Sequence, residues 1–461
     1  MKIAICASEV FPFAKTGGLA DVTGALPLAL ENLGQEVVVF MPKYQMVSEG
    51  KWHLKKVKTG LFSTTMGKDI KVYFVEHNGY FNRPGLYGEK TGDYPDNLDR
   101  FCFFSKKTLE FLKDIDFKPD IIHVHDWQTS LIPVYLKTIY KGSSFYKNIK
   151  TLLTIHNIGY QGLFPKEEFL KLGLDWSLFN IEGLEFYNQI NLLKGGIIFS
   201  DAINTVSPTY SREIQTKEFG FGLEGVLSKK KDRLYGILNG IDYSVWDPLT
   251  DRLIFKNYSV QDLKGKYENK KELQRFCNLP SKDVALFGMV SRLAEQKGWD
   301  ILAEAIDEIC KLDLQLVILG TGDLKYHLIL EKISKIYPQV CSIHLKFDEV
   351  LAHRIYAGSD VFLMPSKYEP CGLGQMISLK YGTLPLVFKT GGLADTVSEE
   401  NGFVFDNYKK EELVKKIKEA LSLYKDKERW NLLVRRAFSY NFSWEESAKK
   451  YIELYQKLVN Q

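Results

Sequence analysis

The pattern of hydrophobic and polar positions divides the chain into two series of short apolar runs separated by helix-like segments. In the first half the runs are near-continuous rather than alternating, which is typical of parallel strands covered on both faces. Each run ends in a Gly, Pro, Asn or Asp signal. The strands predicted here are KIAICA (2–7), EVVVFM (36–41), KVYFVE (71–76), DIIHVH (120–125), TLLTIH (151–156) and AINTVS (202–207).

The second half repeats this scheme, with helical patterns again lying between the apolar runs. Two such series predict an α/β protein built from two doubly wound domains. A stretch rich in Asn, Gly, Asp and Pro follows position 237, and we place the hinge near Gly240. The strands predicted in this half are VALFGMVS (284–291), LQLVILG (314–320), CSIHL (341–345), DVFLMP (360–365) and LPLVF (384–388).

The end of the chain carries an apolar stripe at helical spacing, which predicts a helix that docks on another element. The stripe consists of Tyr451, Leu454, Tyr455, Leu458 and Val459. We therefore expect an N-terminal domain over 1–240, a C-terminal domain over 241–443 and a terminal helix over 444–461.

Composition narrows the classes of function. The 61 basic and 57 acidic residues leave a formal charge of +4, which argues against nucleic acid or an anionic membrane as a general partner. The chain lacks a secretory apolar region and any run near the roughly 18 residues of a membrane helix. Its six cysteines form no C-x-x-C pair, which disfavours structural zinc and redox motifs. A cytoplasmic protein with reduced thiols is the expectation.

The sequence KTGGLAD occurs twice, starting at Lys15 and at Lys389, each time between a predicted strand and a predicted helix. A pair of glycines there could simply permit a tight turn. It could also let an anionic group approach the amides at the helix start, with Lys15 adding positive charge. The second interpretation suits a phosphate. Because neither a P-loop nor a complete dinucleotide fingerprint is present, a kinase-type or NAD-binding protein is poorly supported.

Two loops of the second half carry further candidates. SRLAEQKG places Arg292 and Lys297 after a strand, either as solvated cations or as fixed charges for a leaving diphosphate. SKYEPCGLGQ places Glu369 before a Gly-rich helix start, where a carboxylate and unpaired amides can hold sugar hydroxyls unless Glu369 is merely a surface residue. No metal-binding motif accompanies these loops, so we expect no metal site.

A third loop, TIHNIGYQG, places His156 and Asn157 at the end of a predicted strand. A lone histidine is usually a packing or surface residue, but the carboxyl ends of parallel strands are where ligands bind. His123 and His125 occupy alternate positions of the preceding strand, where packing is the expected role. Asp126 lies just beyond that strand.

Together these motifs resemble one family from end to end, bacterial glycogen synthase and plant starch synthase. The motifs that carry the resemblance, in the family's order, are KTGGLADV, FNRPGLYG, DYPDNLDRFCFFS, IHVHDWQT, TIHNIGYQG, TVSPTY, GILNGID, SRLAEQKG, SKYEPCGLGQ and KTGGLADT. The resemblance implies a GT-B fold, in which two Rossmann-like domains face each other across a deep cleft. It also implies a retaining glycosyltransferase of glycogen biosynthesis without a cofactor, which moves glucose from ADP-glucose to the non-reducing 4-hydroxyl of glycogen or a maltooligosaccharide.

The resemblance also assigns expected roles to residues at matching positions. Lys15 and Gly18 would contact the diphosphate from the first domain, and Arg292 and Lys297 from the second. Glu369 would anchor glucose hydroxyls, and His156 would contact the sugar. The other residues expected to bind substrate are Asp21, Asp126, Asn157, Asn239, Cys371, Gly372 and Leu373, with Phe347 stacking on adenine.

Other functions remain open from the residues alone. A related enzyme could use UDP-glucose or a small acceptor, since nothing near Phe347 separates adenine from uracil. A catalytically weak glucan-binding protein could retain the fold, although it would be expected to lose some of the charged site residues. An oxidoreductase would need a nicotinamide loop that this sequence lacks, and a phosphorylase would need pyridoxal phosphate.

Overall fold

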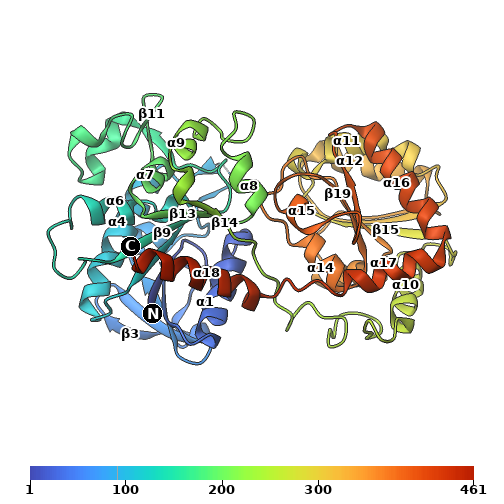
Figure 1. The fold of residues 1–461 in the computed structure, drawn as a ribbon, viewed down its shortest axis with the longest axis horizontal. Coiled ribbons are helices and arrows are strands. Elements are labelled where there is room, and N and C mark those ends of the chain that lie inside the picture. Colours follow the sequence, from blue (N-terminus) through green and yellow to red (C-terminus); the bar gives the residue numbers. More distant parts are fainter. Residues whose placement is uncertain (91) are drawn as a thin grey trace. The chain divides into compact units, whose positions relative to one another are not determined.

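The chain, described over residues 1–90 and 92–461 by a computed structural model, forms two compact units. Unit 1 consists of Met1–Asn239 together with Trp444–Gln461, and unit 2 consists of Gly240–Ser443. The chain therefore leaves unit 1, builds unit 2 and returns to unit 1 for its last helix, α18 (Trp444–Val459), drawn in dark red in Figure 1.

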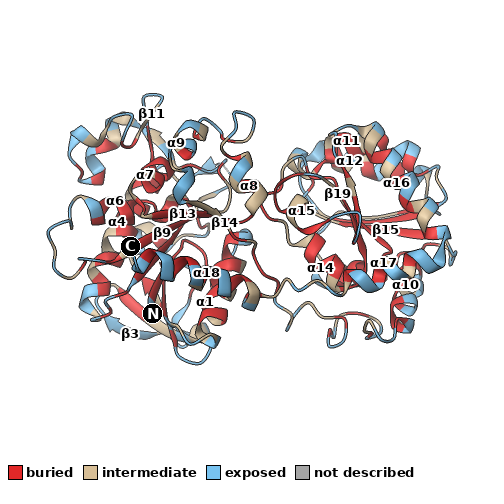
Figure 2. Cartoon of the chain, in the orientation of Figure 1, coloured by how far each residue is buried: buried red, intermediate tan, exposed pale blue. Residues whose placement is uncertain are grey.

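A nine-stranded sheet in the order β14-β13-β9-β8-β1-β2-β5-β4-β3 forms the centre of unit 1. The run from β14 to β5 is parallel, whereas β4 and β3 are added antiparallel at one edge. Most strand residues of its centre are buried, as Figure 2 shows in red. The strands are β1 (Lys2–Cys6), β2 (Glu36–Pro42), β3 (Lys55–Lys58), β4 (Leu61–Met66), β5 (Ile70–Val75), β8 (Ile121–His125), β9 (Lys150–Ile155), β13 (Ala202–Thr205) and β14 (Leu234–Gly236).

Helices connect these strands and cover the sheet. The α-helices are α1 (Gly18–Asn32), α2 (Glu49–Trp52), α3 (Asn78–Phe81), α4 (Asn97–Asp114), α5 (Asp126–Thr129), α6 (Leu131–Lys137), α7 (Leu192–Phe199), α8 (Pro208–Glu213) and α9 (Glu224–Lys229). Three short 3-10 helices are η1 (Lys166–Leu172), η2 (Trp176–Leu178) and η3 (Lys231–Arg233). Two small antiparallel sheets pair β6 (Gly88–Glu89) with β7 (Gly92–Asp93), and β12 (Gln189–Asn191) with both β10 (Leu163–Pro165) and β11 (Glu185–Phe186).

The last helix docks on unit 1 through the stripe predicted from its sequence. Tyr451, Leu454, Tyr455 and Leu458 are buried, whereas Val459 is exposed. The helix packs against α1 and inserts two tyrosine hydroxyls among buried polar groups of the sheet. Figure 1 shows α18 beside α1, so the end of the chain supports the same unit as its beginning.

Unit 2 contains a fully parallel six-stranded sheet in the order β17-β16-β15-β18-β19-β20. Its strands are β15 (Ala285–Val290), β16 (Leu314–Leu319), β17 (Cys341–His344), β18 (Val361–Met364), β19 (Leu384–Phe388) and β20 (Phe403–Phe405). Its helices are α10 (Lys264–Phe276), η4 (Glu295–Lys297), α11 (Trp299–Ile309), α12 (Leu324–Ile336), α13 (Glu349–Gly358), α14 (Gly374–Lys380), α15 (Gly391–Thr396), α16 (Lys410–Lys425) and α17 (Lys427–Ala437).

The strand order of each sheet reverses at one point, between β1 and β8 in unit 1 and between β15 and β18 in unit 2. Ligands of open α/β sheets bind beyond the carboxyl ends of the strands at such points. The two doubly wound parallel sheets confirm the predicted α/β class. The parallel edge strands β14 and β20, the antiparallel strands β3 and β4, and the small sheets of β6 and β7 and of β10 to β12 were not among the predicted strands.

Candidate active site

The loop after β1 is organised by the carboxylate of Glu9, a residue that is only 4% exposed. It accepts hydrogen bonds from the Thr16 amide at 2.5 Å, the Thr16 hydroxyl at 2.6 Å and the Gly17 amide at 3.3 Å. These donors satisfy polar oxygens that burial has removed from water. The sequence analysis did not select Glu9, because a single acidic residue after a strand belongs to no recognisable motif.

The first KTGGLAD sequence leads from this loop into α1. Lys15 Nζ lies 2.6 Å from Asp21 Oδ1, and both side chains are partly exposed. A Cβ atom added to Gly17 or Gly18 would meet nothing within 4 Å, so open space borders the backbone there. No side chain among the described residues caps α1. Although Glu9 uses the amides of Thr16 and Gly17, the helix start at Gly18 therefore remains accessible to an anion.

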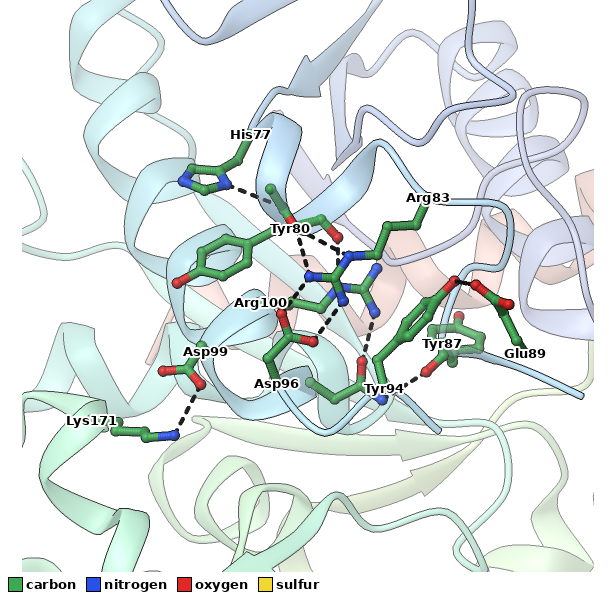
Figure 3. A network of polar contacts seen from close by, with 12 residues as sticks. His77, Tyr80, Arg83, Tyr87, Glu89, Tyr94, Asp96, Asp99, Arg100 and Lys171 are labelled. Atoms are coloured by element: carbon green, nitrogen blue, oxygen red, sulfur yellow. Dashed lines mark hydrogen bonds and ion pairs between the residues drawn. The ribbon is translucent and has the colours of Figure 1, made fainter. Parts of the chain in front are cut away.

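The tyrosine-rich segment 77–97 adds another donor to Glu9. Tyr87 donates its hydroxyl to Glu9 Oε1 at 2.6 Å. The fully buried guanidinium of Arg100 holds this segment by hydrogen bonds to two of its carbonyl oxygens, at 2.7 and 2.9 Å. Figure 3 shows Arg100 within the polar network beside Tyr87 and Tyr94. The network fixes Tyr87, and Tyr87 helps to fix the loop that carries Lys15.

Asp126 and His156 meet where the neighbouring strands β8 and β9 end. Asp126 Oδ1 accepts a hydrogen bond from the main-chain amide of His156 at 2.7 Å. Asp126 has a φ of +53°, a value that is uncommon outside glycine and is often found at functional turns. Burial raises the pKa of Asp126 to about 7, against the opposing effect of the amide hydrogen bonds that it accepts.

His125 contacts His156 directly, although packing was its expected role. The His125 Nδ1 and His156 Nε2 atoms are 2.9 Å apart. Burial lowers the pKa of His156 to about 3 and holds that of His125 well below its usual range, so both rings are neutral at pH 7. The signal in the sequence was the H-x-H-D pattern, which places a histidine at the last position of a buried strand.

His123 continues this group beneath the site. Its ring centroid lies 4.2 Å from that of His125. Its Nδ1 atom is 2.8 Å from the Tyr455 hydroxyl of α18, and its Nε2 atom is 2.7 Å from the hydroxyl of Thr154. A column of buried polar side chains therefore connects the last helix to His156.

Two asparagines selected from the sequence have different surroundings. Asn157 Oδ1 accepts a hydrogen bond from the Gly159 amide at 3.0 Å and so shapes the turn after His156. Asn239, the last residue before the chain enters unit 2, is buried. Within the described chain its Oδ1 atom has no hydrogen-bond partner, which leaves an acceptor for a ligand.

In unit 2, Lys297 and Glu369 come together across the β15–β18 switch point. Lys297 Nζ lies 2.6 Å from Glu369 Oε2, which also accepts a hydrogen bond from the Ser366 hydroxyl at 3.0 Å. Both charged side chains line a cavity of about 190 Å³ that also reaches Gly372 and Leu373. Arg292, in the loop after β15, is exposed and forms no ion pair within the described chain.

The second KTGGLAD sequence supports the Glu369 loop. A Cβ atom added to Gly391 would lie 1.9 Å from the Glu369 carbonyl oxygen, and one added to Gly392 would lie 2.0 Å from that of Cys371. The Gly392 amide donates to the Glu369 carbonyl at 3.1 Å. The same seven residues thus border open space in unit 1 and pack backbone against backbone in unit 2.

The remaining predicted residues lie at the same edge of the unit 2 sheet. Cys371 is buried, Gly372 has a φ of +72°, and Leu373 immediately precedes α14. Phe347 follows β17 and is 89% exposed, so its ring is open to a stacking partner. The strand that it follows, β17, is the outermost strand of the sheet, away from the switch point where Glu369 is found.

No group of three or more His, Cys, Asp or Glu side chains in the described chain is arranged to hold a metal ion. None of the described helices combines the length and apolar character needed to cross a bilayer.

Comparison with known proteins places the chain in a class. A family model described as the starch synthase catalytic domain matches residues 2–229, and one described as glycosyl transferases group 1 matches residues 270–433. The catalytic domain of starch synthase IV from Arabidopsis thaliana, in a structure bound to ADP and acarbose, is 34% identical with a TM-score of 0.90, covering 100% of this chain and 99% of that one. A sucrose-phosphate synthase from Thermosynechococcus elongatus shares the fold at 18% identity and a TM-score of 0.64, with the same coverage. The fold and these matches define a glycosyltransferase of the GT-B class.

A full-length relative narrows the class to a family. The glycogen synthase of Geotalea daltonii is 50% identical over 100% of this chain and 99% of its own length. The chain belongs to the family of bacterial glycogen synthases and plant starch synthases.

Proposed function

We propose that this protein transfers glucose from ADP-glucose to the non-reducing 4-hydroxyl of an α-1,4-glucan, with retention of configuration and release of ADP. The N-terminal domain (1–240) would receive the glucan, and the C-terminal domain (241–443) would bind the donor. Family membership supports the activity, and the related starch synthase IV was solved with ADP, the leaving group of the proposed reaction.

The Lys297–Glu369 pair is the observation that carries the proposal. A cation and a carboxylate lie 2.6 Å apart on one cavity wall. The cation can bind the diphosphate of a nucleotide sugar while the carboxylate binds its sugar. Glu369, with the amides from Cys371 to Leu373, would hold glucose hydroxyls, since hydroxyls both donate and accept. Lys297 and Arg292 would neutralise the charge that grows on the departing diphosphate.

In the proposed step the acceptor 4-oxygen bonds to the anomeric carbon while the bond from that carbon to the β-phosphate oxygen breaks. The electron pair of the broken bond stays with ADP, and the acceptor proton passes to the departing phosphate oxygen. Lys15 and the amide of Gly18 would also stabilise this phosphate, and His156 would contact the reacting sugar. The other side chains proposed to bind donor or acceptor are Asp21, Asp126, Asn157, Asn239 and Phe347.

Retention would follow from attack on the face that ADP leaves. Retaining glycosidases instead use a carboxylate nucleophile placed close to a second carboxyl group. Glu369 is engaged by Lys297 and Ser366, and Asp126 accepts the His156 amide, so both suit binding rather than covalent attack. A glycosyl ester trapped on Glu369 would contradict this route.

The test measures nucleotide release from ADP-glucose and UDP-glucose with maltooligosaccharide as acceptor, together with the anomeric configuration of the product by NMR. Glu369→Gln should lower kcat/KM at least about 100-fold, because it removes a contact to the reacting sugar. Asp406→Asn, which neutralises an exposed carboxylate in the same unit, is the control, and its kcat/KM should stay near the wild-type value. Turnover of UDP-glucose alone would overturn the donor assignment, and glucan binding without turnover of either donor would indicate a regulatory protein.

A further inference from the structure

Unit 1 carries three exposed aromatic side chains next to the loop that follows His156. Tyr160, Tyr187 and Phe221 are 61%, 79% and 47% exposed, and we call this group the aromatic rim. A Cβ atom added to Gly159 would lie 3.8 Å from the Phe221 ring, so Phe221 borders the turn that carries Tyr160. A Cβ atom added to Gly222 would lie 3.4 Å from the Tyr187 ring. The three side chains therefore belong to one continuous surface.

Two members of the rim have backbone conformations that bulky residues rarely adopt. Tyr187 has a φ of +48° and Phe221 a φ of +50°. Tyr187 and Asn188 form the two-residue turn between β11 and β12, where turns with two positive φ values favour Asn-Gly or Asp-Gly. An aromatic side chain in such a position is strained and exposed at once, and residues of this kind cluster at ligand sites.

A buried amide holds the rim in place. Gln161 is 6% exposed, and its Nε2 atom donates to the carbonyl oxygens of Phe221 and Ile158, both at 3.1 Å. Its Oε1 atom accepts a hydrogen bond from Asn191 Nδ2 at 2.7 Å, which connects Gln161 to β12. One side chain thus joins the three segments that carry the rim, so the rim is a preformed surface.

We propose that the aromatic rim binds the acceptor glucan beyond the glucose unit that reacts. Exposed apolar groups gathered at one place usually mark a binding surface. The negative faces of aromatic rings attract the C–H groups that line the apolar side of a glucose unit. The rim is continuous with the turn that follows His156, which the proposed function places at the reacting sugar. The proposal rests on that function, since it identifies the ligand as a glucan chain.

The test uses the full chain with Tyr187→Asn and Phe221→Asn combined. Asparagine tolerates positive φ, so these variants remove the rings without opposing the local backbone. The readout is the ratio of kcat/KM for maltoheptaose to that for maltotriose, together with retardation of the protein in glycogen-containing gels without donor. We expect the double variant to lower the ratio about tenfold and to weaken the retardation. Phe276→Asn, which removes a ring of 46% exposure in unit 2, is the matched control.

The outcomes separate this inference from the proposed function. If the parent protein transfers glucose but the double variant shows an unchanged ratio and unchanged retardation, the glucan-binding role of the rim is wrong and the proposed function stands. A change in oligomeric state without a change in either readout would assign the surface to a second copy of the chain and overturn the glucan assignment. Weakened retardation in the double variant of a protein that transfers no glucose would support the rim and contradict the proposed function.

Discussion

His125 Nδ1 and His156 Nε2 lie 2.9 Å apart in a buried contact, so one ring must donate and the other accept. The other ring nitrogen of His125, Nε2, is buried and has no hydrogen-bond partner within the described chain. Because an orphaned buried N–H group is rarer than an orphaned acceptor, we assign the His125 proton to Nδ1. His156 then keeps its own proton on Nδ1, where it serves as a neutral donor.

This assignment predicts different effects for two substitutions of His125. Asn places its Nδ2–H group where the histidine has Nδ1–H, whereas Phe leaves His156 Nε2 without a donor. We expect His125→Phe to lower kcat about tenfold, through the cost of an unpaired buried acceptor. His125→Asn should recover most of the loss. Steady-state kcat and KM for the donor test this, and equal kcat values for the two variants would contradict a role for the His125–His156 hydrogen bond.

The same histidines predict acid sensitivity in unit 1. Burial lowers the pKa values of His123 and His156 to about 3 and holds that of His125 well below its usual range, whereas the unfolded value is about 6.5. Below pH 6.5 the unfolded chain therefore binds up to three protons that the native state does not bind. The free energy of unfolding falls as the pH is lowered. Asp126, with a pKa raised to about 7, has the opposite effect between about pH 4 and 7 and offsets one of them.

The net effect is about two protons, so the free energy of unfolding should fall by about 3 kcal/mol per pH unit as the pH is lowered from about 6 to about 4. Hydrogen exchange at the amides of β8 and β9 reports this quantity for unit 1. His125→Asn should reduce the slope by about 1.4 kcal/mol per pH unit, because one of the histidines is gone. A slope unchanged by this substitution would show that His125 does not contribute.

The sequence predicted the parallel sheets well because a strand buried on both faces leaves a near-continuous apolar run. It did not predict β3, whose residues Lys55–Lys58 are all exposed. The charged side chains of the candidate site fell within recognisable loops, but Glu9 and His125 did not, because their roles depend on neighbours such as Thr16 and His156. The different uses of the two KTGGLAD sequences were also hidden, since they depend on which backbone packs against the glycines.

A matched pair of glycines tests those two uses. Gly18 and Gly392 are equivalent in the repeat, but a Cβ atom meets nothing within 4 Å at Gly18 and a carbonyl oxygen at 2.0 Å at Gly392. Gly18→Ala should leave the free energy of unfolding within about 0.5 kcal/mol of wild type. Gly392→Ala should lower it by about 1–3 kcal/mol, because backbone must move to admit the methyl group. Thermal unfolding of both variants would show equal losses if the packing were alike.

The docking of the last helix can be tested at Tyr455. Tyr455→Phe removes the hydroxyl that meets buried His123 Nδ1 at 2.8 Å, and should lower the free energy of unfolding by about 1–3 kcal/mol. Tyr267→Phe is the control, since it removes a hydroxyl that donates a hydrogen bond to Asn431 Oδ1 at 2.8 Å on the surface of unit 2. Its cost should stay within about 0.5 kcal/mol. Urea unfolding followed by fluorescence measures both, and similar losses would contradict a special role for the buried column.

The two lysines of the repeat offer the sharpest test of the phosphate role. Lys15 pairs with Asp21 at 2.6 Å beside glycines that face open space, whereas Lys389 pairs with Asp406 at 2.9 Å beside glycines that pack on the Glu369 loop. If Lys15 stabilises the departing diphosphate, Lys15→Ala should lower kcat about 100-fold. Lys389→Ala, which changes the same residue in the same sequence, should keep kcat within about twofold, because loss of an exposed ion pair costs little. Equal losses of kcat for ADP release would mean that both copies of the sequence contact the ligand. Near-normal kcat in both variants would show that Lys15 takes no part in the reaction.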